Sequence, residues 1–149
     1  MAGSDVKAKY IAADTNAADA TSVCTAEQLS GGGEQAIPID GTDDIVVNMP
    51  ALSTANVGTT YEFIVTTAVG GAKTVTFVLP GSGVSNFFGA LTLLGGVAAN
   101  PASDVTGDTL TLPNSTVVNS RVKLTCISDD GTNSTWKAET LSSPIATIA

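Results

Sequence analysis

Apolar and polar residues alternate along much of the chain after residue 36, with the two-residue period of β-strands. The clearest run spans residues 61–67, where Tyr61, Phe63 and Val65 share one face and the intervening residues share the other. Such alternation is typical of a strand with one buried face. Similar alternating, β-branched or apolar runs at 36–39, 45–49, 74–79, 86–94, 109–112, 121–127 and 134–139 predict seven or eight short strands in all.

Turn-forming residues separate these runs. The segment 129–133 contains Asp130-Gly131 between the last two runs, and Asp-Gly in that position is a strong hairpin signal. Gly70-Gly71 separates 61–67 from 74–79, so these two runs are predicted to form another hairpin. Short strands at this spacing predict a single-domain all-β fold, a β-sandwich or a small β-barrel of antiparallel strands.

The two ends of the chain lack the strand pattern. Residues 1–20, rich in Ala, Asp, Asn and Thr, predict an N-terminal arm. Thr25 and Gln28 have the spacing of a capping box, which predicts one short helix over 26–30 that the glycines at 31–33 end. Residues 141–149 are either a frayed tail or a strand added to a neighbouring subunit. The domain itself is expected over residues 21–140.

The composition of the chain excludes several classes of function, although it adds little to the prediction of the fold. The chain has 149 residues, the size of one domain, and a net charge of −8 from six Lys plus Arg against fourteen Asp plus Glu. Six cations are too few to line a phosphate backbone, and nucleic-acid binding is therefore not expected. No apolar stretch approaches the roughly 20 residues of a membrane span. The polar start lacks a secretory pattern, so we expect synthesis in a cytoplasm and no membrane partner.

The residues of common catalytic and metal sites are scarce. There is no histidine, which removes the commonest general base and the usual zinc ligand. Cys24 and Cys126 are interpreted as buried free thiols, with a disulfide as the alternative. Asp40, Asp43 and Asp44 offer several oxygens in one turn, but their spacing matches no complete calcium loop. We therefore expect no enzyme activity, no cofactor and no metal ion.

A longer pattern runs from residue 58 to residue 138. It consists of the strand Gly58-Thr59-Thr60-Tyr61-Glu62-Phe63, the pair Phe88-Gly89, the run Gly107–Leu112, and the closing segment Ser120–Leu124 with Asp130-Gly131-Thr132-Asn133-Ser134-Thr135-Trp136. This order resembles the small β-rich head decoration, or capsid cement, proteins of tailed bacteriophages, in which a Gly-x-x-Tyr-x-Phe strand and a closing Ser-Asp-Gly-Thr-Asn-Trp hairpin recur. Here a second Asp and the pair Ser134-Thr135 are additions to that hairpin.

The resemblance implies a structural virion protein that binds the outer capsid shell as a homo-oligomer, commonly a trimer, with the major capsid protein as partner. It implies no catalytic residues. The alternative is a phage fibre, baseplate or adhesin-like module with a carbohydrate-binding face, for which Trp136 would be the stacking aromatic. The residues predicted to contact partners are Lys7, Lys9, Tyr10, Trp136, Ile145 and Ile148.

Overall fold

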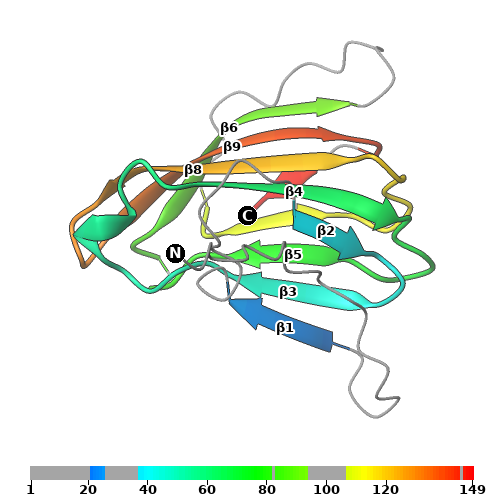
Figure 1. Ribbon diagram of the computed structural model, residues 1–149, viewed down its shortest axis with the longest axis horizontal. Coiled ribbons are helices and arrows are strands. Elements are labelled where there is room, and N and C mark those ends of the chain that lie inside the picture. Colours follow the sequence, from blue (N-terminus) through cyan, green and yellow to red (C-terminus); the bar gives the residue numbers. More distant parts are fainter. Residues whose placement is uncertain (1–20, 26–36, 82, 94–106, 145) are drawn as a thin grey trace, which may run out of the picture.

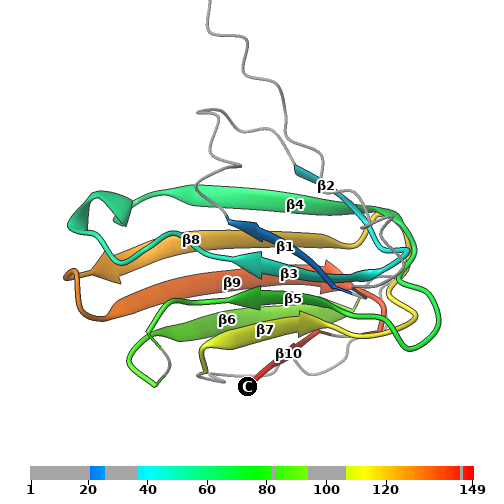
Figure 2. The same ribbon diagram turned by 90° about the horizontal axis from the view of Figure 1, so that it is seen from below.

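The computed structural model describes residues 21–25, 37–81, 83–93, 107–144 and 146–149. Two five-stranded sheets pack face to face as a sandwich (Figures 1 and 2). Sheet 1 has the order β1-β3-β5-β7-β10, formed by Thr21–Thr25, Asp44–Asn48, Val75–Val78, Thr109–Leu112 and Thr147–Ile148. Sheet 2 has the order β2-β4-β8-β9-β6, formed by Ile37–Asp40, Thr60–Thr67, Arg121–Asp129, Ser134–Ser142 and Asn86–Leu93. The predicted all-β sandwich is confirmed.

The core lies between the sheets and is built from the alternate residues that the sequence pattern singles out. In β4 the buried positions are Tyr61, Phe63 and Val65, as predicted. The rings of Phe63 in sheet 2 and Phe77 in sheet 1 lie 4.8 Å apart between centroids, which joins the two layers. The inward positions of strands from both sheets therefore meet in one hydrophobic core.

The chain changes sheet at almost every connection. Among the strands of the described residues, β1 to β7 alternate strictly between sheet 1 and sheet 2, and only β8 and β9 are consecutive strands in the same sheet. Strands two apart in sequence therefore become neighbours, and β1–β3, β2–β4 and β3–β5 pair in parallel. Together with β6–β9, four of the eight strand pairs are parallel. The prediction of an antiparallel fold with seven or eight strands is wrong in both respects, since the sheets are mixed and the described residues alone form ten strands.

The predicted hairpin between 61–67 and 74–79 is also wrong. These segments are β4 in sheet 2 and β5 in sheet 1. The residue that separates them physically is Val69, which is buried and exchanges backbone hydrogen bonds with the segment before β8: its N–H donates to the Thr116 carbonyl, and its carbonyl accepts from Ser115 N–H, both at 2.9 Å. These hydrogen bonds fix Val69 at the edge of the sandwich, where the chain passes from sheet 2 to sheet 1. Gly70-Gly71 therefore lies in a loop that connects the two sheets and not in a hairpin.

The predicted hairpin around Asp130-Gly131 is confirmed as the connection between β8 and β9. Gly131 has φ of +86°, a backbone conformation that glycine adopts without strain. The pairing contains one irregularity, between Cys126 and Ser128, where Ile127 is the extra residue of a β-bulge. Its side chain is 49% exposed.

The C-terminal residues belong to the sandwich. Strand β10 pairs antiparallel with β7 of the same chain, and Ile148 lies in the core at 8% exposure. Neither interpretation of residues 141–149, a frayed tail or a strand added to a neighbouring subunit, predicted this pairing of residues 147–148 within their own chain. The predicted N-terminal arm and the helix at 26–30 lie outside the described residues, and Thr25 is the last residue of β1.

Candidate functional site

The outward positions of sheet 2 form a broad surface, which we call the sheet 2 face. Strand alternation sends the buried residues of β4, β8 and β9 into the core and leaves the others on the outside. The charged residues of this face are Glu62, Arg121, Lys123, Lys137 and Glu139, and its large apolar residues are Ile64, Phe88, Ile127 and Leu141. A surface of this composition has both the charges and the apolar area that protein interfaces use.

Cations gather on the sheet 2 face. Of the four Lys and Arg residues in the described ranges, three lie there, and the fourth, Lys73, pairs with Asp43 and Asp44 at the start of β3. The strand register places Glu62, Lys123 and Glu139 directly across β4, β8 and β9 in one row of alternating sign. Opposite charges in such cross-strand positions stabilise the register of the sheet.

The ion pairs on this face are loose and solvated. Lys137 Nζ lies 3.4 Å from Glu139 Oε1, and Arg121 lies 4.0 Å from Glu62, with side chains between 34% and 57% exposed. Exposed pairs of this kind contribute about 0–1 kcal/mol each. The charges are therefore held in place by the sheet while remaining available to a partner.

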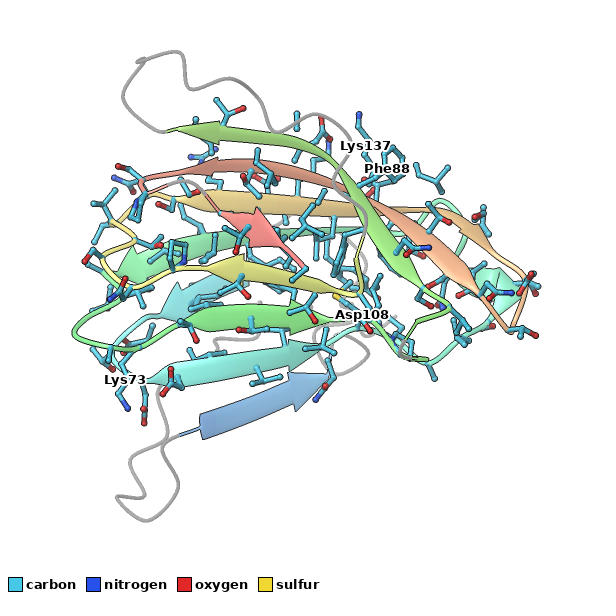
Figure 3. The ribbon with its side chains drawn as sticks, turned by 180° about the vertical axis from the view of Figure 1, so that it is seen from behind. Lys73, Phe88, Asp108 and Lys137 are labelled. Atoms are coloured by element: carbon cyan, nitrogen blue, oxygen red, sulfur yellow. The ribbon has the colours of Figure 1, made fainter. Side chains whose placement is uncertain are left out.

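Phe88 is the aromatic residue that distinguishes this face. Within the described part of the chain, the other aromatic side chains all belong to the core, whereas Phe88 is half-buried. It is the register partner of Lys137 across β6 and β9, and Figure 3 shows the two side by side on the outer surface. Aromatic residues are enriched at the centres of protein interfaces and lysine is depleted there, so Phe88 is the residue of this pair that indicates an interface.

A glycine next to Phe88 brings β6 close to β9. Gly89 has φ of +142°, and a Cβ there would overlap the Ala138 carbonyl oxygen. Only a residue without a side chain permits this approach. Gly89 thus holds β6 in the position that places Phe88 beside Lys137.

Two of the six residues predicted to contact partners are core residues in the structure. Trp136 is 1% exposed and stacks on Tyr61 with ring centroids 6.0 Å apart, so it is a core residue and not a partner or sugar platform. Ile148 is a core residue as well. Lys7, Lys9, Tyr10 and Ile145 lie outside the described residues. Phe88 was missed, although two adjacent phenylalanines in a strand signal that one must face outward.

The carboxylates of the described turns have structural partners. Lys73 donates to Asp43 Oδ1 at 2.9 Å, and this hydrogen bond holds the pKa of Asp43 below its ordinary value. Asp44 accepts the N–H of Thr74 at 2.8 Å, so the two aspartates tie the start of β3 to the start of β5. Within the described ranges, no group of three His, Cys, Asp or Glu side chains is placed to hold a metal ion.

Asp129 joins two loops at the other end of the sandwich. Its carboxylate is 5% exposed and accepts hydrogen bonds from Ser53 N–H, Asn56 Nδ2 and Gly131 N–H at 2.9–3.0 Å. Ser53 and Asn56 belong to the turn around the short 3-10 helix η1, Thr54–Asn56. Burial alone raises the pKa of Asp129, but these hydrogen bonds outweigh it and hold the pKa below its ordinary value.

Cys126 is free and buried, as predicted, while the side chain of Cys24 lies outside the described residues. Burial, together with the nearby Asp129 charge, raises the pKa of the Cys126 thiol to about 11. A thiol in this state is a poor nucleophile at neutral pH because the reactive form is the thiolate.

Comparison with known proteins finds no matching family model, no matching curated protein and no matching solved structure. In the parts of the chain that the structure describes, no helix has the length and apolar character of a membrane span.

Proposed function

We propose that this protein is a structural component of a tailed-phage virion, which decorates the outer capsid shell as a homo-oligomer. The observation that supports this proposal is the sheet 2 face, where three cations and a half-buried phenylalanine are displayed by rigid strands. Surfaces built on regular elements hold their side chains in fixed positions, which suits a binding surface. The resemblance of residues 58–138 to capsid cement proteins provides the virion context.

A structural role also agrees with how the polar side chains are used. Asp43, Asp44 and Asp129 hold turns together, and the buried Ser85 and Ser134 hydroxyls bond to each other at 3.0 Å. These groups stabilise the sandwich by local hydrogen bonds. The charged side chains of the sheet 2 face remain exposed to a partner.

The alternative role, a fibre or adhesin-like module that binds carbohydrate, needs an exposed aromatic ring. Trp136 does not provide it, because the ring lies in the core. Phe88 would be the stacking residue in that case, and glycan binding that depends on Phe88 would support the alternative over capsid decoration.

The test is sedimentation of purified protein with capsid shells that lack it. We expect the wild-type protein to sediment with the shells and to have a native mass of several monomers. Phe88→Ser should weaken shell binding by roughly 30-fold, the loss of a central interface aromatic. Val118→Ser is the matched control, since Val118 is an exposed apolar residue outside the face, in the loop before β8. A monomer that never sediments with shells would refute the proposal.

A further inference from the structure

The arrangement of charges on the sheet 2 face is self-complementary. Along β9, Lys137 and Glu139 are successive outward residues, so a cation and an anion lie one row apart on the same strand. Rotation by 180° about an axis in the plane of the face, across the strands and between these two rows, exchanges the rows. Lys137 of one copy then lies over Glu139 of the other, and the reverse holds at the symmetric position.

We propose that the sheet 2 face binds a second copy of this chain, face to face about this two-fold axis. The inference rests on the proposed homo-oligomeric role and names a second copy, rather than the shell, as the partner of this surface; Phe88→Ser then weakens shell binding by weakening self-association. At the centre, two Lys137–Glu139 pairs combine into four charges of alternating sign, which converts two loose surface pairs into one network. Interfaces between identical subunits related by a two-fold axis are self-complementary in this way.

The other outward residues are compatible with the same axis. The exchange of rows places Lys123 over Thr125 of the second copy and Glu62 over Thr60, because these pairs occupy the same two rows on β8 and β4. Phe88 lies over Ala90, which leaves room for the ring. No like charges face each other, although each chain carries a net charge of −8. Like-charge contacts would cost several kcal/mol, so their avoidance matters.

The outer face of sheet 2 is large enough for a stable contact between two copies, whereas the outer face of sheet 1 is smaller. Five strands at about 4.8 Å spacing and roughly eight residues at about 3.4 Å each give a flat area of about 650 Å² for sheet 2. This approaches the roughly 800 Å² that each partner buries in a stable interface. Most strands of sheet 1 have four or five residues, so its outer face offers about half that area. Packing of two aligned sheets also matches a standard sheet-on-sheet contact.

The experiment is a charge exchange read by native mass in sedimentation equilibrium. Lys137→Glu and Glu139→Lys should each weaken self-association by at least about tenfold, since each places like charges together twice across the axis. The double variant K137E/E139K restores opposite charges at the same positions, and its net charge equals that of the wild-type chain. We expect it to recover the wild-type mass.

A matched control exchanges the other ion pair on the face. The double variant E62R/R121E keeps the net charge, and neither residue faces a charge of the second copy, so its native mass should equal that of the wild-type protein. Thermal unfolding of all variants should remain within a few degrees, because exposed pairs contribute little to folding.

The outcomes separate this inference from the proposed function. Failure of K137E/E139K to recover the mass would overturn the face-to-face contact. So would a native mass of three copies, since a two-fold contact gives an even number of subunits. Single variants that lose shell binding but keep their native mass would show that the face binds the shell directly. That result overturns the second-copy contact and leaves the decoration role intact.

Discussion

At the scale of single residues, buried polar groups in this protein hold loops in place. Asp129 is the clearest case, because its one carboxylate bonds to the η1 turn and to the β8–β9 hairpin. The bonds to Ser53 and Asn56 were not evident from the sequence, where Asp129 has the character of an ordinary turn residue. Sequence separation explains this: Ser53 and Asn56 are more than 70 positions away, and local patterns do not report such contacts.

The ionised form of Asp129 should contribute to stability above about pH 4. Its folded pKa is lowered, so the contribution is complete above the pKa of an unfolded aspartate, about 3.9, and is lost as pH falls through the folded pKa. We expect Asp129→Asn to lower the free energy of unfolding by about 1–3 kcal/mol at pH 7. Urea unfolding between pH 5 and pH 3 should then show a weaker pH dependence than in the wild-type protein.

Asp130→Asn is the control for this prediction, because Asp130 is exposed and its hydrogen bonds stay within its own hairpin. At pH 7, Asp130→Asn should lower the free energy of unfolding by less than Asp129→Asn does. Equal pH dependence of the wild-type and Asp129→Asn proteins would contradict the role assigned to Asp129.

The thiol of Cys126 should be inert in the folded protein. With a pKa of about 11, roughly one thiol in a thousand is ionised at pH 8, and the side chain is also buried. In a Cys24→Ser variant, which leaves Cys126 as the only thiol, labelling by a disulfide reagent should proceed only as fast as the protein opens. Addition of urea should raise the rate to that of a free thiol; rapid labelling without urea would contradict this.

At the scale of elements, the sequence located strands well and their partners poorly. The period-2 pattern around Tyr61, Phe63 and Val65 reports which face is buried, and burial is a property that alternation encodes directly. It does not report which sheet the strand joins, because both sheets bury the same kind of side chain. The assignment of β4 and β5 to different sheets depends on Val69, whose hydrogen bonds to 115–116 are invisible to local reasoning. The candidate site could not be predicted for the same reason. Phe88 lies beside Lys137 only because β6 and β9 pair in parallel in this register.

The β6–β9 pairing should depend strongly on Gly89. In Gly89→Ala, the new methyl group would overlap the Ala138 carbonyl oxygen, and alanine disfavours φ of +142°. We expect a loss of roughly 2 kcal/mol or more in the free energy of unfolding, measured by urea titration. Gly131→Ala is the matched control: its φ is also positive, but no heavy atom lies within 4 Å of the added methyl. Similar losses in the two variants would show that the close approach of β6 to β9 contributes little.

At the scale of the whole molecule, the frequent change of sheet makes the sandwich depend on its ends. Because neighbours in each sheet are distant in sequence, few strands form a local unit that is stable alone. The β8–β9 hairpin is the exception. Strand β10 illustrates the consequence, since it forms one edge of sheet 1 by pairing with β7, from which β8 and β9 separate it in the sequence.

Residues 141–149 should therefore be needed for folding as well as for any assembly. Removing them deletes the end of β9, the buried Ala146 and Ile148, and the backbone pairing between Ala149 and Thr109. We expect the truncated chain to lose cooperative thermal unfolding, followed by circular dichroism. A milder version is Ile148→Ser, which should cost about 2–4 kcal/mol by emptying a core position.

Thr147→Ser is the control for that substitution, because Thr147 is the neighbouring residue on the exposed face of the same strand. It should change stability by less than about 0.5 kcal/mol. Two observations would instead support a tail that serves only to contact a partner: a truncated chain that melts at the wild-type temperature, and equal stability of the Ile148→Ser and Thr147→Ser proteins. Because β10 pairs with β7 of the same chain, removal of β10 should lower both folding and self-association, whereas substitutions on the sheet 2 face should lower self-association alone.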